Sequence, residues 1–147
     1  MTMRIRPSGI WIVNKKLLTL RYSYGGRERY NLPGGGHEGQ ETLVDTLIRE
    51  FHEELGVTIS VAHLQFIAET LVQDQHTLHM VFQMASLTGT PQCRRPETSA
   101  LDIVWLPLEN LAPGILYPNI SEALQSVFLH VLPQPVHLGR IDQPWYG

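Results

Sequence analysis

Residues 34–57 read GGGHEGQETLVDTLIREFHEELGV, and this stretch carries the clearest structural pattern in the chain. Its apolar residues recur at helical spacing, and Gly56 follows them at a position where a helix can end. We therefore predict a helix over Glu41–Leu55, entered from a glycine run that breaks regular structure. The apolar stripe of this helix consists of Leu43, Val44, Leu47, Ile48, Phe51 and Leu55.

Three glutamates fall on one side of the predicted helix. Glu50, Glu53 and Glu54 stand at positions i, i+3 and i+4, within about a third of the helix circumference. Like charges at this spacing destabilise a helix by roughly 0.2–0.5 kcal/mol per pair, and the helix C-terminus disfavours anions. A bound divalent cation removes the conflict, and a carboxylate site of this kind suits Mg²⁺ or Mn²⁺.

The alternative is a solvated acidic surface, which the three glutamates taken alone would fit better. Their neighbours favour a binding site instead. Arg49 lies beside the cluster, and Glu41 can reach Arg49 and hold the acidic residues in orientation. The glycines before the helix allow a backbone path that brings a carbonyl and amides close to a metal or a phosphate.

The stretch resembles the Nudix box, whose pattern is Gly-x5-Glu-x7-Arg-Glu-U-x-Glu-Glu-x-Gly-U, with U a bulky apolar residue. The flanks are similar too: residues 30–35 (YNLPGG) resemble the family's lead-in, and residues 105–111 resemble its late strand and turn. So many specified positions at fixed spacing make a much stronger signal than a lone glycine-rich loop. The matching residues are Gly35, Glu41, Arg49, Glu50, Phe51, Glu53, Glu54, Gly56 and Val57.

This resemblance implies a fold, a reaction and a set of roles. The expected fold is α/β, an α/β/α sandwich around a mixed sheet, with residues 1–147 forming one Nudix hydrolase domain. The expected reaction is attack of water at phosphorus in a nucleoside diphosphate that is linked to another group. The resemblance also suggests a homodimer. The implied roles are metal binding by Glu50, Glu53, Glu54 and the Gly34 carbonyl, and support by Glu41 and Arg49.

Two carboxylates compete for the role of general base. Relatives use either a glutamate of the box or a carboxylate from a later loop. Glu50 is the candidate within the box, and Glu97 is the distant candidate, in the loop before the strand that contains Trp105. For Glu97, an exposed loop glutamate without a function is an equally good interpretation. Asp102 is a weaker candidate, because it reads equally well as an outward-facing strand residue.

Arginines before the box are candidate phosphate ligands, because guanidinium binds phosphate bidentately. Arg21, Arg27 and Arg29 fit this description, although charged residues near a loop more often serve solubility. Tyr30 offers a stacking surface to an aromatic group of the substrate. Gly35 lets the backbone approach the substrate closely. Nucleoside triphosphates, nucleotide sugars and similar small diphosphates all stay open, because residues 72–75 lack the markers of ADP-ribose and dinucleoside polyphosphate hydrolases.

The remaining segments alternate between strands and helices without a strict order, which favours a mixed sheet. Residues 25–29 and 89–98 are predicted loops, and we assign no structure to the tail from Leu132. Trp145 and Tyr146 could cover an apolar surface or a partner, and the sequence does not decide between them. The predicted strands are 4–13, 17–24, 57–72, 76–87 and 100–106, with a turn of helix near 108–111 and a second helix over 118–131.

Composition narrows the functional classes. The chain is 43% hydrophobic and 17% charged with a net charge of −3, as in an ordinary globular domain. This charge argues against binding to polymeric nucleic acid, and the lack of a long apolar segment argues against a membrane span. We expect a cytoplasmic enzyme with a small-molecule substrate. The rival hypothesis is a non-catalytic nucleotide-sensing module, although such domains usually lose carboxylates of the box.

Overall fold

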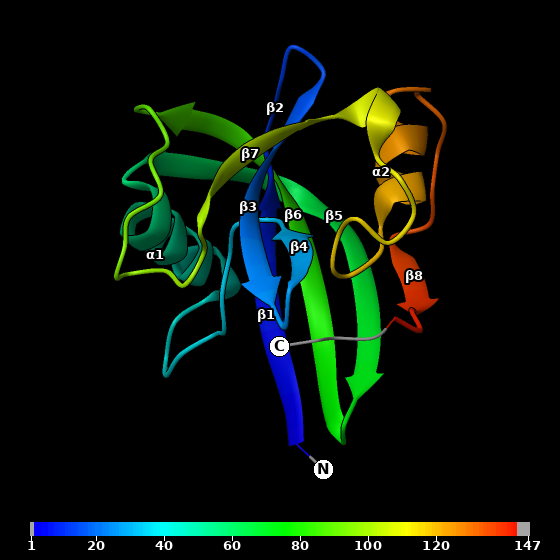
Figure 1. The fold of residues 1–147 in the computed structure, drawn as a ribbon, viewed down its shortest axis with the longest axis horizontal. Helices are drawn as coiled ribbons and strands as arrows, with labels where there is room; N and C mark the ends of the chain where they lie inside the picture. The colour runs from blue at the N-terminus through cyan, green and yellow to red at the C-terminus, as the bar shows by residue number, and fades with distance from the viewer. Residues whose placement is uncertain (1, 144–147) are drawn as a thin grey trace.

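The computed structural model describes residues 2–143 as an α/β protein with two sheets (Figure 1). Trp145 and Tyr146 lie outside the described residues. Within residues 2–143, none of the helices has the length and apolar character needed to cross a membrane. The elements in chain order are β1 (Thr2–Ile10), β2 (Ile12–Val13), β3 (Lys16–Tyr24), β4 (Arg27–Asn31), α1 (Leu43–Leu55), β5 (Thr58–Val72), β6 (Gln75–Thr88), β7 (Asp102–Pro107), the 3₁₀ turn η1 (Leu108–Asn110), α2 (Ser121–Phe128) and β8 (His137–Arg140).

The first sheet is mixed and has the strand order β1-β6-β5-β8. Strands β1 and β8 run parallel to their neighbours, whereas β5 and β6 are antiparallel to each other. The second sheet joins β2, β3 and β4, with β7 paired to β3, and all of these pairs are antiparallel. The predicted α/β class with a mixed sheet is therefore confirmed.

The two helices lie on opposite sides of the sheets (Figure 1), and each covers its own core. Under α1, the side chains of Leu47, Phe51 and Leu55 are fully buried against strand residues. Under α2, Ala123 and Leu124 pack into the other core. Burial of each large apolar side chain contributes roughly 1.5–3 kcal/mol to the stability of the fold. Because this face of α1 is anchored in the core, its remaining faces have fixed directions, and these carry the box glutamates.

Local sequence sets both ends of α1. The Thr42 hydroxyl accepts a hydrogen bond from the Asp45 amide (3.1 Å), and the Asp45 carboxylate accepts one from the Thr42 amide (3.2 Å). This reciprocal pair is a capping box, so the helix begins after Thr42 rather than at Glu41. At the other end, Gly56 adopts a φ of 69°, in the left-handed region that favours glycine.

Two predictions about apolar faces are corrected by burial. Val44 and Ile48 of the predicted α1 stripe are 38% and 39% exposed, because the core contacts a narrower arc of the helix than the apolar residues cover. The second helix, predicted over 118–131, ends at Phe128, so the apolar residue Val131 lies beyond it and is exposed.

Long-range pairing corrects three other predictions. Residues 4–13 are two strands, because the chain leaves the first sheet after Ile10 and enters the second sheet as β2. The predicted loop at residues 25–29 is reduced to Gly25-Gly26, since Arg27 already pairs with Tyr24. The tail contains β8, which pairs with β5 as an edge strand.

Candidate active site

The glycine run lies against β1 and is hydrogen-bonded to it along its length. The Gly9 amide donates to the Pro33 carbonyl (2.9 Å), and the Gly35 amide donates to the Pro7 carbonyl (3.2 Å). The approach is so close that a Cβ on Gly34 would lie 2.2 Å from the Pro7 carbonyl oxygen. Only glycine fits at this position, and the packing holds the start of the box in place.

The next glycine contacts α1. A Cβ on Gly35 would lie 2.4 Å from both the carboxyl carbon and the Oε1 atom of Glu50. The Glu50 carboxyl group is therefore seated directly on the backbone at Gly35, with 15% of the side chain exposed. The glycine run and the helix, separated by a short loop in the sequence, thus form the two walls of one site.

Arg49 organises the acidic side chains from its place between them. Its Nε and Nη2 atoms donate to the two carboxylate oxygens of Glu41 at 2.7 Å and 3.0 Å. Its Nη1 atom donates to Glu50 at 2.9 Å and to Glu53 at 3.2 Å. The hydrogen bonds from Arg49 lower the pKa of Glu41 to about 2. Arg49 and Glu41 therefore act as a scaffold that holds Glu50 and Glu53 side by side.

Glu54 is in a different environment, because it points into the protein and is only 5% exposed. Burial raises the pKa of Glu54 to about 7, although hydrogen bonds from the Thr98 hydroxyl and the Gly34 amide oppose this shift. Its buried Oε1 atom has no hydrogen-bond partner. A buried polar atom without a partner is costly to the fold, and such exceptions indicate a functional role or an absent ligand.

The donor set fits a hard divalent cation, since carboxylate and carbonyl oxygens are the ligands that Mg²⁺ prefers. The unpartnered oxygen of Glu54 supports this fit. However, no three Asp, Glu, His or Cys residues within positions 2–143 converge closely enough to hold a metal ion. In this arrangement the Arg49 guanidinium forms ion pairs with both Glu50 and Glu53.

The loop after β6 folds back onto the end of α1. The amides of Gln92 and Arg94 donate to the carbonyls of Leu55 (3.0 Å) and Glu54 (2.9 Å). Glu97 follows in this loop as an exposed residue, next to the buried Thr98 that contacts Glu54. The structure therefore places the segment of the distant base candidate beside the box.

The predicted phosphate-binding arginines are held in other interactions. Arg21 pairs with Asp102 at 2.8 Å, because β3 and β7 place these two residues opposite each other, and it also pairs with Glu28 of β4 at 2.9 Å. Arg29 is 5% exposed and lies 5.4 Å from the ring centroid of Tyr117. The contact of Arg21 also occupies Asp102, the weaker base candidate. Arg27 is exposed, and the Tyr30 hydroxyl donates to Glu28 (3.1 Å), so their substrate contacts stay predictions.

Two arginines outside the predicted set face the site from β1. Arg6 lies close enough to Glu50 and Glu54 for its charge to lower the pKa of each, although burial raises both overall. The Nη2 atom of Arg4 lies 3.3 Å from the position of a Cβ on Gly36. Within residues 2–143, neither arginine forms an ion pair with a carboxylate. The sequence contains an indication of this arrangement, because residues 4 and 6 of a strand point to the same face.

Comparison with known proteins agrees with this geometry. The family model described as NUDIX domain matches residues 3–127. No curated protein has a sequence that matches the chain.

Solved structures that share the fold include the following three. The ORF135 protein of E. coli is 21% identical, with a TM-score of 0.74 over 86% of this chain and 91% of that one. A MutT NUDIX hydrolase from Burkholderia pseudomallei is 20% identical, with a TM-score of 0.71 over 82% and 96%. An ADP-ribose pyrophosphatase from Streptococcus suis is 16% identical, with a TM-score of 0.61 over 96% and 100%. At these identities the likeness shows the fold alone.

Proposed function

This chain belongs to the NUDIX domain family and is a pyrophosphohydrolase, and from that premise we propose that it cleaves the diphosphate linkage of a nucleoside diphosphate derivative with a divalent cation, Mg²⁺ or Mn²⁺. The observation that carries the proposal is the buried Glu54 carboxylate, whose Oε1 atom has no partner. A cation at this oxygen would supply the interaction that the protein itself does not provide.

We assign metal binding to Glu50, Glu53 and Glu54, with the Gly34 carbonyl as a further ligand. A divalent cation held there supplies charge neutralisation of the phosphates and a hydroxide generated from water. The support for these ligands is their chemistry and their common attachment: Arg49 bonds to Glu50 and Glu53, and Glu41 holds the opposite edge of the same guanidinium. Glu41 and Arg49 therefore orient the carboxylates without contacting the substrate.

Arg6 is the residue that we propose for the substrate phosphates. Its guanidinium faces the box carboxylates, and among residues 2–143 no carboxylate forms an ion pair with it. Guanidinium groups bind phosphate oxygens through charge-assisted hydrogen bonds. Arg21, by contrast, would have to leave Asp102 and Glu28 before it could bind a phosphate.

The general base is Glu50 or Glu97. Glu50 is seated on Gly35 inside the box. Glu97 belongs to a loop that is hydrogen-bonded to α1 through the carbonyls of Leu55 and Glu54. Glu97→Gln distinguishes the two: if Glu97 is the base, the acid limb of the pH–rate profile disappears, whereas an unchanged profile assigns the role to Glu50.

The test of the function is a substrate panel assayed with and without Mg²⁺. The panel contains nucleoside triphosphates, nucleotide sugars, dinucleoside polyphosphates and ADP-ribose, the last because the Streptococcus suis protein is described as an ADP-ribose pyrophosphatase. We expect turnover of at least one member that stops when the metal is chelated. Nucleotide binding without turnover of any member would favour the non-catalytic sensor.

Variants that replace a glutamate with the uncharged glutamine test the assigned ligands. Glu53→Gln and Glu54→Gln are expected to remove most of the turnover while the thermal midpoint stays near that of the native chain. Glu122→Gln is the matched control, because Glu122 is an exposed glutamate in the first turn of α2, on the other helix. Full activity in both box variants would contradict the assignment.

A further inference from the structure

Thr46 is a fully buried polar residue near the start of α1. Threonine is a poorer helix former than leucine or alanine, and burial of a hydroxyl group costs free energy unless the group forms a hydrogen bond. The position belongs to the seven residues between Glu41 and Arg49 that the box pattern leaves unspecified. The pattern therefore gives Thr46 no role, and the contacts of its hydroxyl have to explain why it is there.

Two acceptors compete for the Thr46 hydroxyl. Its Oγ1 atom lies 3.2 Å from the Thr42 carbonyl, the bond that threonine commonly forms within a helix, and 3.1 Å from the Oε1 atom of Glu41. The Thr42 carbonyl already accepts the backbone amide of Thr46 at 3.0 Å. A hydroxyl carries one proton, and a carboxylate is the stronger acceptor. The geometry therefore favours donation to Glu41.

With this bond, the acceptor sites of the Glu41 carboxylate are filled. Its Oε2 atom accepts from the Nε atom of Arg49 at 2.7 Å. Its Oε1 atom accepts from the Nη2 atom of Arg49 at 3.0 Å and from the Glu38 amide at 3.3 Å, in addition to the Thr46 hydroxyl. A carboxylate has about four lone-pair sites, so each of them has a donor. Thr46 approaches from the core, on the side where neither Arg49 nor solvent can hold the carboxylate.

Arg49 has a second carboxylate within reach. Glu38 lies 3.7 Å from its Nη2 atom and is 72% exposed, so this contact is weak while Glu41 keeps its place. A guanidinium is planar and rigid, and any rotation that carries Nη2 toward Glu38 also displaces Nη1. Nη1 is the atom that binds Glu50 and Glu53. The orientation of Glu41 therefore sets the positions of the two box carboxylates.

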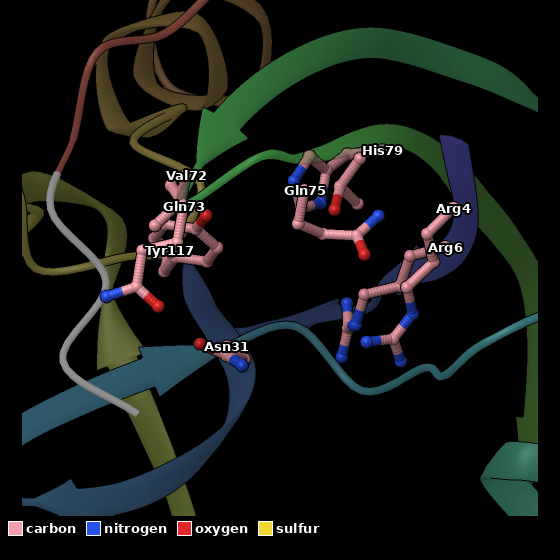
Figure 2. A pocket seen from close by; sticks show the side chains of 9 residues that line it. Arg4, Arg6, Asn31, Val72, Gln73, Gln75, His79 and Tyr117 are labelled. Carbon is pink, nitrogen blue, oxygen red and sulfur yellow. The ribbon is translucent and has the colours of Figure 1, made fainter. Parts of the chain in front are cut away.

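These contacts are separate from the pocket that Arg4 and Arg6 line (Figure 2). Among the described residues, those that line this pocket include none from α1. A substitution at Thr46 therefore removes no group from the pocket lining, and its direct effect is limited to the support of the box carboxylates.

We propose that Thr46 is a positioning residue, whose hydroxyl holds the Glu41 carboxylate against Arg49. Arg49 in turn keeps Glu50 and Glu53 in the orientation in which they bind the cation. The inference rests on the proposed function, which assigns the divalent cation to these glutamates.

The first test uses the metal-free chain. Exchange of the Arg49 Nε proton with water, measured by ¹⁵N NMR, reports on its hydrogen bond to Glu41, and the absence of the signal in Arg49→Lys identifies it. Thr46→Val replaces the hydroxyl with a methyl group of similar size. We expect about fivefold faster exchange in this variant, the factor that corresponds to the loss of one hydrogen bond. Thr46→Ser keeps the hydroxyl and is expected to restore near-native exchange.

The second test measures Mn²⁺ binding by electron paramagnetic resonance. Loss of a group that orients a metal ligand typically weakens metal binding by about tenfold or more. Because Thr46 acts through Glu41 and Arg49, we expect a smaller loss for Thr46→Val, of about fivefold, and recovery in Thr46→Ser. In a chain that also carries Glu41→Ala, Thr46→Val should cause no further loss, whereas a general structural effect would add to that of Glu41→Ala.

Thr19→Val is the matched control. Thr19 is also fully buried, and its hydroxyl donates to the Val104 carbonyl between β3 and β7. This variant should be destabilised to a similar extent in thermal unfolding, but its Mn²⁺ affinity and its Arg49 proton exchange should stay native. Should Thr46→Val fail to fold, Thr46→Ala, which also lacks the hydroxyl, takes its place.

The two proposals fail in distinguishable ways. If the native chain binds Mn²⁺ and turns over a substrate, but Thr46→Val keeps the native proton exchange or the native Mn²⁺ affinity, the role of Thr46 is wrong and the proposed function stands. If the native chain neither binds Mn²⁺ nor turns over any substrate, the proposed function is wrong, and faster exchange in Thr46→Val would support only the hydroxyl's hold on Glu41 and Arg49.

Discussion

Gly35→Ala is the sharpest probe of how the backbone positions the acidic cluster. The added Cβ would lie 2.4 Å from the carboxyl carbon of Glu50, whereas ordinary contact begins at 3.4 Å. The carboxyl group must therefore retreat by about 1 Å, and a misplacement of about 1 Å can lower the rate about a hundredfold. The backbone itself tolerates alanine here, because Gly35 does not have a positive φ.

The expected result is a loss of kcat of about a hundredfold with little loss of stability, since a flexible side chain can move at a cost of about 1 kcal/mol. The assay combines steady-state kinetics on the preferred substrate with thermal unfolding followed by circular dichroism. Gly36→Ala is the matched control: its Cβ meets nothing closer than the flexible end of Arg4, at 3.3 Å. A Gly35→Ala chain that unfolds normally and retains the native kcat would refute the claim that the seat of Glu50 matters.

Two further perturbations follow from the hydrogen bonds and burial of single residues. Glu41→Gln weakens the contacts to Arg49 at 2.7 Å and 3.0 Å, so we expect the apparent affinity for Mg²⁺ to fall about tenfold, measured by titrating the metal in the activity assay; an unchanged titration would count against the scaffold role. Burial lowers the pKa of His79 to about 3, below its value of about 6.5 in an unfolded chain. The unfolded state therefore binds the extra proton between these values, and stability rises with pH across this window by at most about 1.4 kcal/mol per unit. Urea unfolding from about pH 4 to 7 should show a flatter dependence for His79→Gln than for the native chain, and parallel curves would exclude this origin.

The part of the site that sequence predicts well is the part built from neighbouring residues. The spacing of Glu50, Glu53 and Glu54 places them together on any helix, and the capping residue Thr42 and the terminal Gly56 are readable from the same stretch. What this local pattern could not show is the contrast between these carboxylates. Glu54 is buried beneath the loop that carries Thr98, whereas Glu53 is partly exposed next to Arg49.

The contacts of the arginines depend on strands that are far apart in the sequence. Arg21, Arg27 and Arg29 lie close to the box in the sequence, but the pairing of β3 with β7 places Asp102 opposite Arg21. The pairing of β1 with β6 instead brings Arg6 beside His79, and both residues line one pocket. Register between distant strands depends on the whole sheet, and a shift by one residue would turn these side chains to the other face.

The sequence alone indicates the family, the mixed α/β class, the helix and the chemistry of its acidic face, because helical periodicity and capping act over a few residues. Tertiary structure alone decided that strand 4–13 divides between two sheets, that the tail supplies β8, and that Arg6, Asn31 and His79 border one cavity. The physical reason is range: a helix closes its hydrogen bonds within one segment, whereas a strand takes its partners, its register and its burial from chain far away.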